Sequence, residues 1–245
     1  MTHRSWLVLA QAYVNTTEAD ALLSHFGDID AVALQSESAL RAAGLSEKKA
    51  RAVTAVNKDL LEDTLRWLDS DDHHIVVHGT TEYPELLGQI GGAPLLLYVN
   101  GSVEALHLPA LAVVGSRNPT RGGIRNSLDF SRYLARSGAA IVSGLAEGID
   151  TAAHRGALSV NGTTVAVLGH GIDRVYPARN HGLAHEIAAT GALVTEYPPG
   201  APPDKRHFPE RNRIISGLAL GTLVVEAARR SGSLITARLA AEQGR

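Results

Sequence analysis

Two loops of this chain combine small residues with the start of a helical stretch. The sequence Gly-Ser-Arg at 115–117 follows an apolar segment at 111–114, and Ser-Gly at 143–144 ends the apolar segment that begins at 140. Backbone N–H groups at a helix start bind anions, and glycine lets a ligand approach the backbone closely. The arginine of the first loop adds a cation beside them. The pattern therefore predicts that a phosphate-like anion binds where these strands end.

Two later segments have the same character. Four cations lie within residues 205–213, and Pro209 favours a helix start there. Further along, Gly232 permits close approach, Ser233 is expected to cap a third helix start, and Thr236 offers a hydroxyl one turn later. The alternative for the basic residues is structural salt bridging. The predicted anion site comprises Gly115, Ser116, Arg117, Ser143, Gly144, Lys205, Arg211, Asn212, Arg213, Gly232, Ser233 and Thr236.

Arginine dominates the charge of the second half of the chain. Residues 111–245 carry 16 Lys and Arg against 10 Asp and Glu, whereas residues 1–110 carry 7 against 15. Only one of the 16 cations is lysine, and arginine is the side chain that binds phosphate in a bidentate manner. This composition favours a polyanionic ligand, with a solvated basic face as the alternative. At the start of the helix predicted near 122–137, Arg121 and Arg125 form a secondary basic stripe.

Several kinds of catalytic site are excluded. No Gly-Lys pair occurs, so there is no Walker A loop, and the patterns G-x-S-x-G and H-E-x-x-H are absent. The first loop also lacks the G-x-G-x-x-G of nicotinamide sites, and without cysteine there is no disulfide or thiolate metal site. Asp150 and His154 lie one helical turn apart, but no third ligand has a suitable spacing. We therefore expect no metal, with Asp150 bound to N–H groups of the first helical turn and His154 packed locally.

Strands and helices alternate from residue 111 onward. The strands are expected at 111–114, 140–142, 164–168, 192–195 and 222–226. The helices are expected near 122–137, 148–160, 181–190, 209–219 and 234–243. Nearly continuous apolar strands alternating with helices are typical of an α/β fold, an open parallel sheet with helices on both faces.

The first 72 residues have a different pattern. Residues 5–68 predict several short helices, and the Gly-Leu-Ser sequence at 44–46 predicts a helix end followed by a cap. This hairpin resembles helix-hairpin-helix units that bind nucleic-acid backbones. Because the module is acidic, we favour a packing or partner role over direct DNA binding.

A polar segment after residue 68 separates this module from the rest. We predict a small all-helical domain at 1–72 and a second domain at 73–245, whose first part, 73–110, is an extended lead-in that ends in an Asn-Gly turn at 100–101. The chain stops at the end of a helix, where a strand would follow, so we expect a domain truncated at its C-terminus. No apolar segment approaches the roughly 20 residues of a membrane span, and no secretory signal begins the chain, which favours a cytoplasmic protein.

The order and spacing of these motifs resemble the bacterial DNA-processing protein A family, also called DprA/Smf. The helical N-terminal module also looks like the accessory domain of that family, which is of a SAM or helix-hairpin-helix type. The motifs that carry the resemblance are Val114-Gly-Ser-Arg117, Ser143-Gly-Leu-Ala-Glu-Gly-Ile-Asp150 with Ala152-Ala-His154, Gly169-His-Gly-Ile-Asp173 with Tyr176-Pro177, Glu196-Tyr-Pro-Pro-Gly200, Phe208-Pro-Glu-Arg-Asn-Arg-Ile-Ile215 and Ser231-Gly-Ser-Leu-Ile-Thr-Ala237.

The resemblance implies an extended Rossmann-like domain that binds single-stranded DNA without sequence preference and without a cofactor. It also implies protection of incoming DNA, loading of the RecA recombinase onto it in natural transformation, and a homodimer. Contacts of the dimer and of RecA that need the following strand or a winged-helix module are in doubt, because the chain stops at 245. Matched by motif position, the DNA site would include Gly115, Ser116, Arg117, Lys205, Gly232, Ser233 and Thr236.

An enzyme of the same fold is the alternative. Phosphoribohydrolases cleave nucleoside monophosphates, and the carboxylate of Glu226 could stabilise a ribosyl cation there. Those enzymes, however, have a Pro-Gly-Gly-x-Gly-Thr pattern at the last loop, where this chain has Arg-Arg-Ser-Gly-Ser. Aromatic residues are scarce after residue 110, so we expect phosphate contacts to outweigh base stacking. We favour a binding protein with no catalytic residues.

Overall fold

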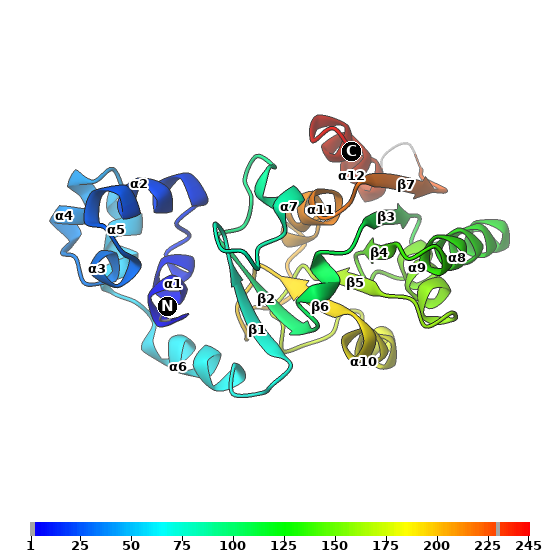
Figure 1. Ribbon diagram of the computed structural model, residues 1–245, viewed down its shortest axis with the longest axis horizontal. Coiled ribbons are helices and arrows are strands. Elements are labelled where there is room, and N and C mark those ends of the chain that lie inside the picture. The colour runs from blue at the N-terminus through cyan, green and yellow to red at the C-terminus, as the bar shows by residue number, and fades with distance from the viewer. Residues whose placement is uncertain (1–2, 229–230) are drawn as a thin grey trace.

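The N-terminal module consists of short helices, as expected. The computed structural model describes residues 3–228 and 231–245 (Figure 1). Five of the helix starts are capped by a side chain that accepts a hydrogen bond from the N–H three residues later, which satisfies one of the free donors there: Asn15, Asp28, Ser36, Ser46 and Asn57. The helices are α1 (His3–Gln11), α2 (Thr16–Phe26), α3 (Ile29–Ala33), α4 (Glu37–Ala42), α5 (Glu47–Thr54) and α6 (Lys58–Trp67).

A seven-stranded sheet forms the centre of the molecule, in the order β1-β2-β6-β5-β4-β3-β7. The strands are β1 (His73–Val77), β2 (Leu96–Gly101), β3 (Ala110–Gly115), β4 (Ala140–Ser143), β5 (Thr164–Val167), β6 (Ala192–Thr195) and β7 (Gly221–Val225). The five strands predicted after residue 110 are parallel to one another, which confirms the α/β class.

The sheet is mixed rather than purely parallel, because the lead-in segment supplies two strands. β2 pairs antiparallel with both β1 and β6. Its end is not the predicted turn: Gly101 is the last residue of β2 at φ +109°, and a Cβ there would lie 2.4 Å from the carbonyl oxygen of Gly191. Glycine at 101 thus serves close strand packing rather than a hairpin.

Helices cover both faces of the sheet, as predicted. Ile214 and Ile215 of one helix pack on one face, whereas Ile149 and Ala153 of another pack on the other face. The remaining helices are α7 (Glu85–Gly88), α8 (Arg121–Arg136), α9 (Ile149–Leu158), α10 (His181–Thr190), α11 (His207–Gly217) and α12 (Gly232–Glu242), with 3₁₀ turns η1 (Glu104–Leu106) and η2 (Ala178–Asn180). No helix among the residues given above has the length and hydrophobicity to cross a membrane.

The N-terminal module lies at one end of the molecule and α8 at the other (Figure 1). The apolar core of the module is continuous with the sheet through Ile75, Val77 and Tyr98. Trp67, at the end of α6, stacks on His73 with ring centroids 4.2 Å apart and meets the ring of Tyr98 edge-on at 6.1 Å. The division of the chain into domains after residue 72 stays a proposal.

The close packing of α8 on α9 gives a first prediction. A Cβ on Gly156 would lie 2.5 Å from the carbonyl oxygen of Leu128 and 2.9 Å from the Cβ of Ser131. We expect Gly156→Ala to lower the free energy of unfolding by about 1–3 kcal/mol, because the two helices must separate. The control is Gly182→Ala in α10, where a Cβ meets no atom within 4 Å and should stabilise the helix by up to about 1 kcal/mol. Urea unfolding measures both, and a Gly156→Ala protein as stable as the parent would contradict the packing.

Candidate functional site

Five segments that are distant in sequence converge on one cavity of about 550 Å³ at the carboxyl ends of β3 and β7. The starts of α11 and α12 form its other walls. Side chains or backbone of nine of the twelve predicted site residues line this cavity: Gly115, Ser116, Arg117, Lys205, Arg211, Asn212, Gly232, Ser233 and Thr236.

Two exposed cations face this cavity from different segments. Arg117 follows β3, and its guanidinium carbon lies 5.8 Å from the ring centroid of Phe208. Lys205 lies just before α11 and is exposed. Within the described ranges neither side chain forms an ion pair, whereas the neighbouring Arg206 is bound to Asp204 at 2.8 Å. Arg117 and Lys205 are therefore available to an anionic ligand.

The first turn of α12 adds backbone donors. Gly232 is exposed, and a Cβ there would meet no atom within 4 Å. The N-cap residue is Ser231, not Ser233 as we expected; its side chain makes no cap hydrogen bond and instead lies 2.8 Å from the hydroxyl of Ser233. Among the described residues, the N–H groups of Gly232 and Ser233 in this first turn have no hydrogen-bond acceptor, whereas that of Leu234 donates to the carbonyl of Ser231 at 3.1 Å. Arg229 and Arg230, which the sequence also places in this loop, lie outside the described residues.

The structure argues against Ser143 and Gly144 as anion donors, because both are hydrogen-bonded within the chain. One carboxylate oxygen of Asp150 accepts hydrogen bonds from the N–H groups of Gly144 at 3.2 Å and Ala146 at 3.3 Å. The hydroxyl of Ser143 is buried and donates to the carbonyl of Val113 at 2.6 Å. The chain's own carboxylate thus occupies the position where a bound anion would lie. It binds N–H groups of the loop before α9 rather than those of the first helical turn, which we had expected it to bind.

Arg211 forms part of the cavity floor. It is only 4 % exposed, and its guanidinium donates to the carbonyl oxygens of Gly144, at 2.9 Å, and Val167. Burial lowers the pKa of Arg211 to about 10, so the side chain keeps its charge at neutral pH. Burial also raises the pKa of Asp150, and the charge of Arg211 opposes that rise. Asn212 joins this floor to α12, because its amide donates to the carbonyl of Gly232 at 3.3 Å.

Arg213 does not belong to the cavity, so the structure argues against it as a ligand contact. Its guanidinium forms two bonds of 2.7 Å to the carboxylate of Glu196 and one of 2.9 Å to the carbonyl of Gly92. The reason is helical geometry: residues two apart point to nearly opposite sides, and Arg211 points to the cavity. Arg121 and Arg125 are exposed on α8, and neither lines this cavity.

Two aromatic residues at the cavity were missed. Tyr176 and Phe208 both line it, with ring centroids 5.7 Å apart. They also line an adjoining cavity of about 260 Å³, together with Arg117 and Arg211. The Tyr-Pro and Phe-Pro motifs that contain them were visible in the sequence, but the scarcity of aromatic residues led us to discount stacking. The structure concentrates two of the few aromatic rings at this one place.

Glu226 does not line the cavity. Its carboxylate accepts hydrogen bonds from the N–H of Thr120 at 2.8 and 3.0 Å and from the Thr120 hydroxyl at 2.8 Å, while its carbonyl accepts the N–H of Ser116 at 2.8 Å. Glu226 adopts φ +56°, a left-handed conformation that is costly for a side chain with a Cβ. Its role here is to hold the loop that carries Arg117 against β7.

Glu226 gives a second prediction. Glu226→Ala removes the partner of two donors of Thr120, and we expect the free energy of unfolding to fall by about 1.5–3 kcal/mol. Glu186→Ala, an exposed glutamate of α10 that forms no ion pair in the described part of the chain, is the control and should change stability little. Equal unfolding midpoints for the two variants in urea would show that the contact with Thr120 is unimportant.

His154 is buried and hydrogen-bonded locally, as expected. Its Nδ1 lies 2.7 Å from the hydroxyl of Thr164, which itself donates to the carbonyl of Ile141. Burial, followed by the charge of Arg211, lowers the pKa of His154 to about 3, and burial also lowers the pKa of His170. No group of three or more potential metal ligands occurs among residues 3–228 and 231–245.

The buried histidine gives a third prediction, for pH. Below pH 6.5 the imidazole of residue 154 binds a proton in the unfolded chain, whereas His154 in the folded protein stays neutral down to about pH 3. The free energy of unfolding that depends on His154 is therefore highest above pH 6.5 and falls as the pH drops toward 3. The slope per histidine is at most about 1.4 kcal/mol per pH unit. Asp150 acts with the opposite sign, because its pKa is raised. We expect His154→Asn to reduce the slope of unfolding free energy between pH 6.5 and 5, and an unchanged slope would contradict the assignment.

Known proteins match this sequence closely. The sequence model of the DNA recombination-mediator protein A family matches residues 74–245. Protein Smf of Escherichia coli is 46% identical over 218 residues, which cover 89% of this chain and 57% of the relative. DNA processing protein DprA of Streptococcus pneumoniae is 47% identical over 163 residues, or 66% of this chain and 57% of the relative. The chain thus spans about half the length of the curated relatives that it matches.

Solved structures agree. The X-ray structure of DprA from Streptococcus pneumoniae matches with a TM-score of 0.86 and 33% identity, covering 100% of this chain and 85% of that one, which confirms the Rossmann-like fold with its N-terminal helices. DNA processing protein A from Helicobacter pylori, described for its single-stranded DNA binding mode, matches with a TM-score of 0.65 and 31% identity over 70% of this chain and 77% of that one. On sequence and structure together, the chain belongs to the DNA recombination-mediator protein A family.

Proposed function

We propose that this chain binds single-stranded DNA without sequence preference, through the cavity at the ends of β3 and β7. The observation that carries the proposal is the convergence of Arg117 and Lys205, both free of ion pairs in the described part of the chain, with the ring pair of Tyr176 and Phe208. Cations and aromatic rings side by side are what a single strand needs, because its phosphates and its unstacked bases are both accessible.

Each group has a role in this proposal. Arg117, Lys205 and the open N–H groups of α12 bind phosphates, which carry no sequence information. Tyr176 and Phe208 stack on bases, and any base offers a face for stacking. Duplex DNA keeps its bases stacked inside, so it loses the aromatic contribution. Arg211 stays in the floor and contributes its positive potential without touching the strand.

Roles of the whole family protein extend the proposal. We include protection of incoming DNA, loading of RecA onto it during natural transformation, a homodimer and a cytoplasmic location. Family membership supports these roles, as does the similarity to proteins named for DNA processing. We propose no catalytic residue. The phosphoribohydrolase alternative needs a free carboxylate, whereas Glu226 is bound to Thr120; release of free base from AMP that depends on Glu226 would favour that alternative.

The balance between phosphate contacts and stacking gives a fourth prediction. We expect Arg117→Ala to weaken binding of oligothymidine about tenfold and to reduce the slope of log K against log salt by about 0.7, the value for one phosphate on a single strand. Phe208→Ala should weaken binding by about 1–3 kcal/mol and leave the slope unchanged, because stacking releases no counterions. Fluorescence anisotropy at several salt concentrations measures both.

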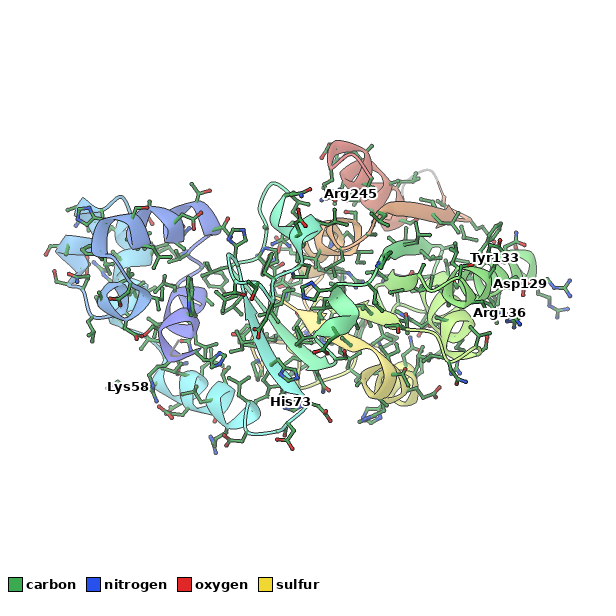
Figure 2. The ribbon with its side chains drawn as sticks, viewed as in Figure 1. Lys58, His73, Asp129, Tyr133, Arg136 and Arg245 are labelled. Atoms are coloured by element: carbon green, nitrogen blue, oxygen red, sulfur yellow. The ribbon has the colours of Figure 1, made fainter. Side chains whose placement is uncertain are left out.

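Lys58→Ala is the matched control, an exposed cation on α6 far from the cavity (Figure 2). It should leave affinity and slope unchanged. Arg117→Ala should weaken oligothymidine and mixed sequences alike. A parent protein that binds duplex as tightly as single strands, or an Arg117→Ala protein with altered base preference at full affinity, would refute the proposal.

A further inference from the structure

Helix α8 exposes aromatic side chains as well as arginines. Three of the nine large apolar side chains that the described residues leave exposed lie on this one helix: Ile124 at 42 %, Phe130 at 53 % and Tyr133 at 71 %. Figure 2 shows Tyr133, Asp129 and Arg136 together at the end of the molecule farthest from the N-terminal helices, with their side chains directed outward. The side chains of Phe130 and Tyr133 are more than half exposed, so packing within the described residues does not require an aromatic ring at either position.

The arginines of this helix are also uncommitted. Arg121, Arg125 and Arg136 are exposed, and within residues 3–228 and 231–245 they form no ion pair. Arg132 differs, because it binds Asp129 at 3.1 Å and the hydroxyl of Ser159 at 3.2 Å.

Helix geometry places these cations and rings together. Arg125 and Arg136 are eleven residues apart, which is close to three full turns, so both lie on one face. Tyr133 precedes Arg136 by three residues and so lies beside it, whereas Arg121 and Phe130, nine residues apart, lie at the two edges of the exposed side of the helix. The surface is therefore both basic and aromatic.

The same helix starts at the rim of the cavity. Ser116 and Arg117 line the cavity, and three residues later Thr120 caps α8 through the N–H of Gly123. The contact between Thr120 and Glu226 holds this start in place. From there α8 runs for 16 residues, or about 24 Å, so its arginines continue the basic lining outward.

We propose that the outer face of α8, formed by Arg121, Arg125, Phe130, Tyr133 and Arg136, is a second contact surface for the same single-stranded DNA and holds the part of the strand that leaves the cavity. This inference rests on the proposed function. The excess of unpaired positive charge favours a polyanion over a protein partner, and exposed rings beside arginines offer stacking to bases that the cavity does not reach. The experiment must distinguish single-stranded DNA from a protein partner as the ligand of this face.

Two lengths of oligothymidine distinguish the two surfaces, because only a long strand can reach from the cavity to α8. We choose about 4 and about 16 nucleotides, the limits of site size for single-strand-binding folds. We expect Arg125→Ala/Arg136→Ala and Tyr133→Ala to weaken binding of the long strand at least fivefold and to leave binding of the short strand unchanged. The double variant should also reduce the salt slope of the long strand by about 1.4, which corresponds to two phosphates. Because all three side chains are exposed, the melting temperature should stay at the parent value.

Lys58→Ala/Arg66→Ala on α6 removes the same charge elsewhere and should change neither strand. Arg117→Ala should weaken both strands. If Arg117→Ala weakens both but the α8 variants bind the long strand like the parent, the inference fails and the face is left to a protein partner. If the parent protein binds neither strand, the proposed function itself fails.

Discussion

The buried guanidinium of Arg211 joins the parts from which the cavity is made. It donates to the carbonyl of Gly144, after β4, and to that of Val167, in β5, while its own helix forms a cavity wall. A buried charge costs several kcal/mol unless hydrogen bonds and an opposite charge compensate it, and here two carbonyls and the neighbouring Asp150 do so. The arrangement also demands glycine at 144, because a Cβ would lie 2.3 Å from the guanidinium.

This arrangement divides the charges of the site into fixed and available ones. Asp150 satisfies the N–H groups of the second loop, so among residues 3–228 and 231–245 the cavity offers an anion the donors of Arg117, of Lys205 and of the start of α12. The available groups lie on exposed segments at the rim, whereas Arg211 and Asp150 lie in the floor. A ligand with spaced single charges and flat apolar faces fits such a rim better than a compact polyphosphate does.

Much of the fold followed from local patterns in the sequence. Continuous apolar segments alternating with helices predicted the parallel strands, and the carboxyl ends of such strands meet at one edge, which is why Arg117 and Gly232 could be placed together. The direction of β2 could not be read in this way, because an extended apolar segment pairs equally well in either direction. The N-terminal caps were predictable at Ser46, where a Ser directly precedes a helical stretch.

The errors at the site have separate causes. The prediction of Arg213 as a ligand contact was avoidable, since helical spacing alone puts it on the side opposite to Arg211. The prediction of Ser143 and Gly144 was not avoidable, because their pattern is that of an anion-binding loop. Only the fold shows that the carboxylate of Asp150 takes the place of an anion there. Phe208 and Tyr176 come from segments 32 residues apart, so no spacing rule brings their rings together.

A crystal structure of this chain with a bound oligothymidine would show directly whether one strand of DNA lies across the cavity. We expect phosphates within hydrogen-bond distance of Arg117, Lys205 and the first N–H groups of α12, with a base against Phe208 or Tyr176. DNA bound to the N-terminal helices, with the cavity empty, would contradict it.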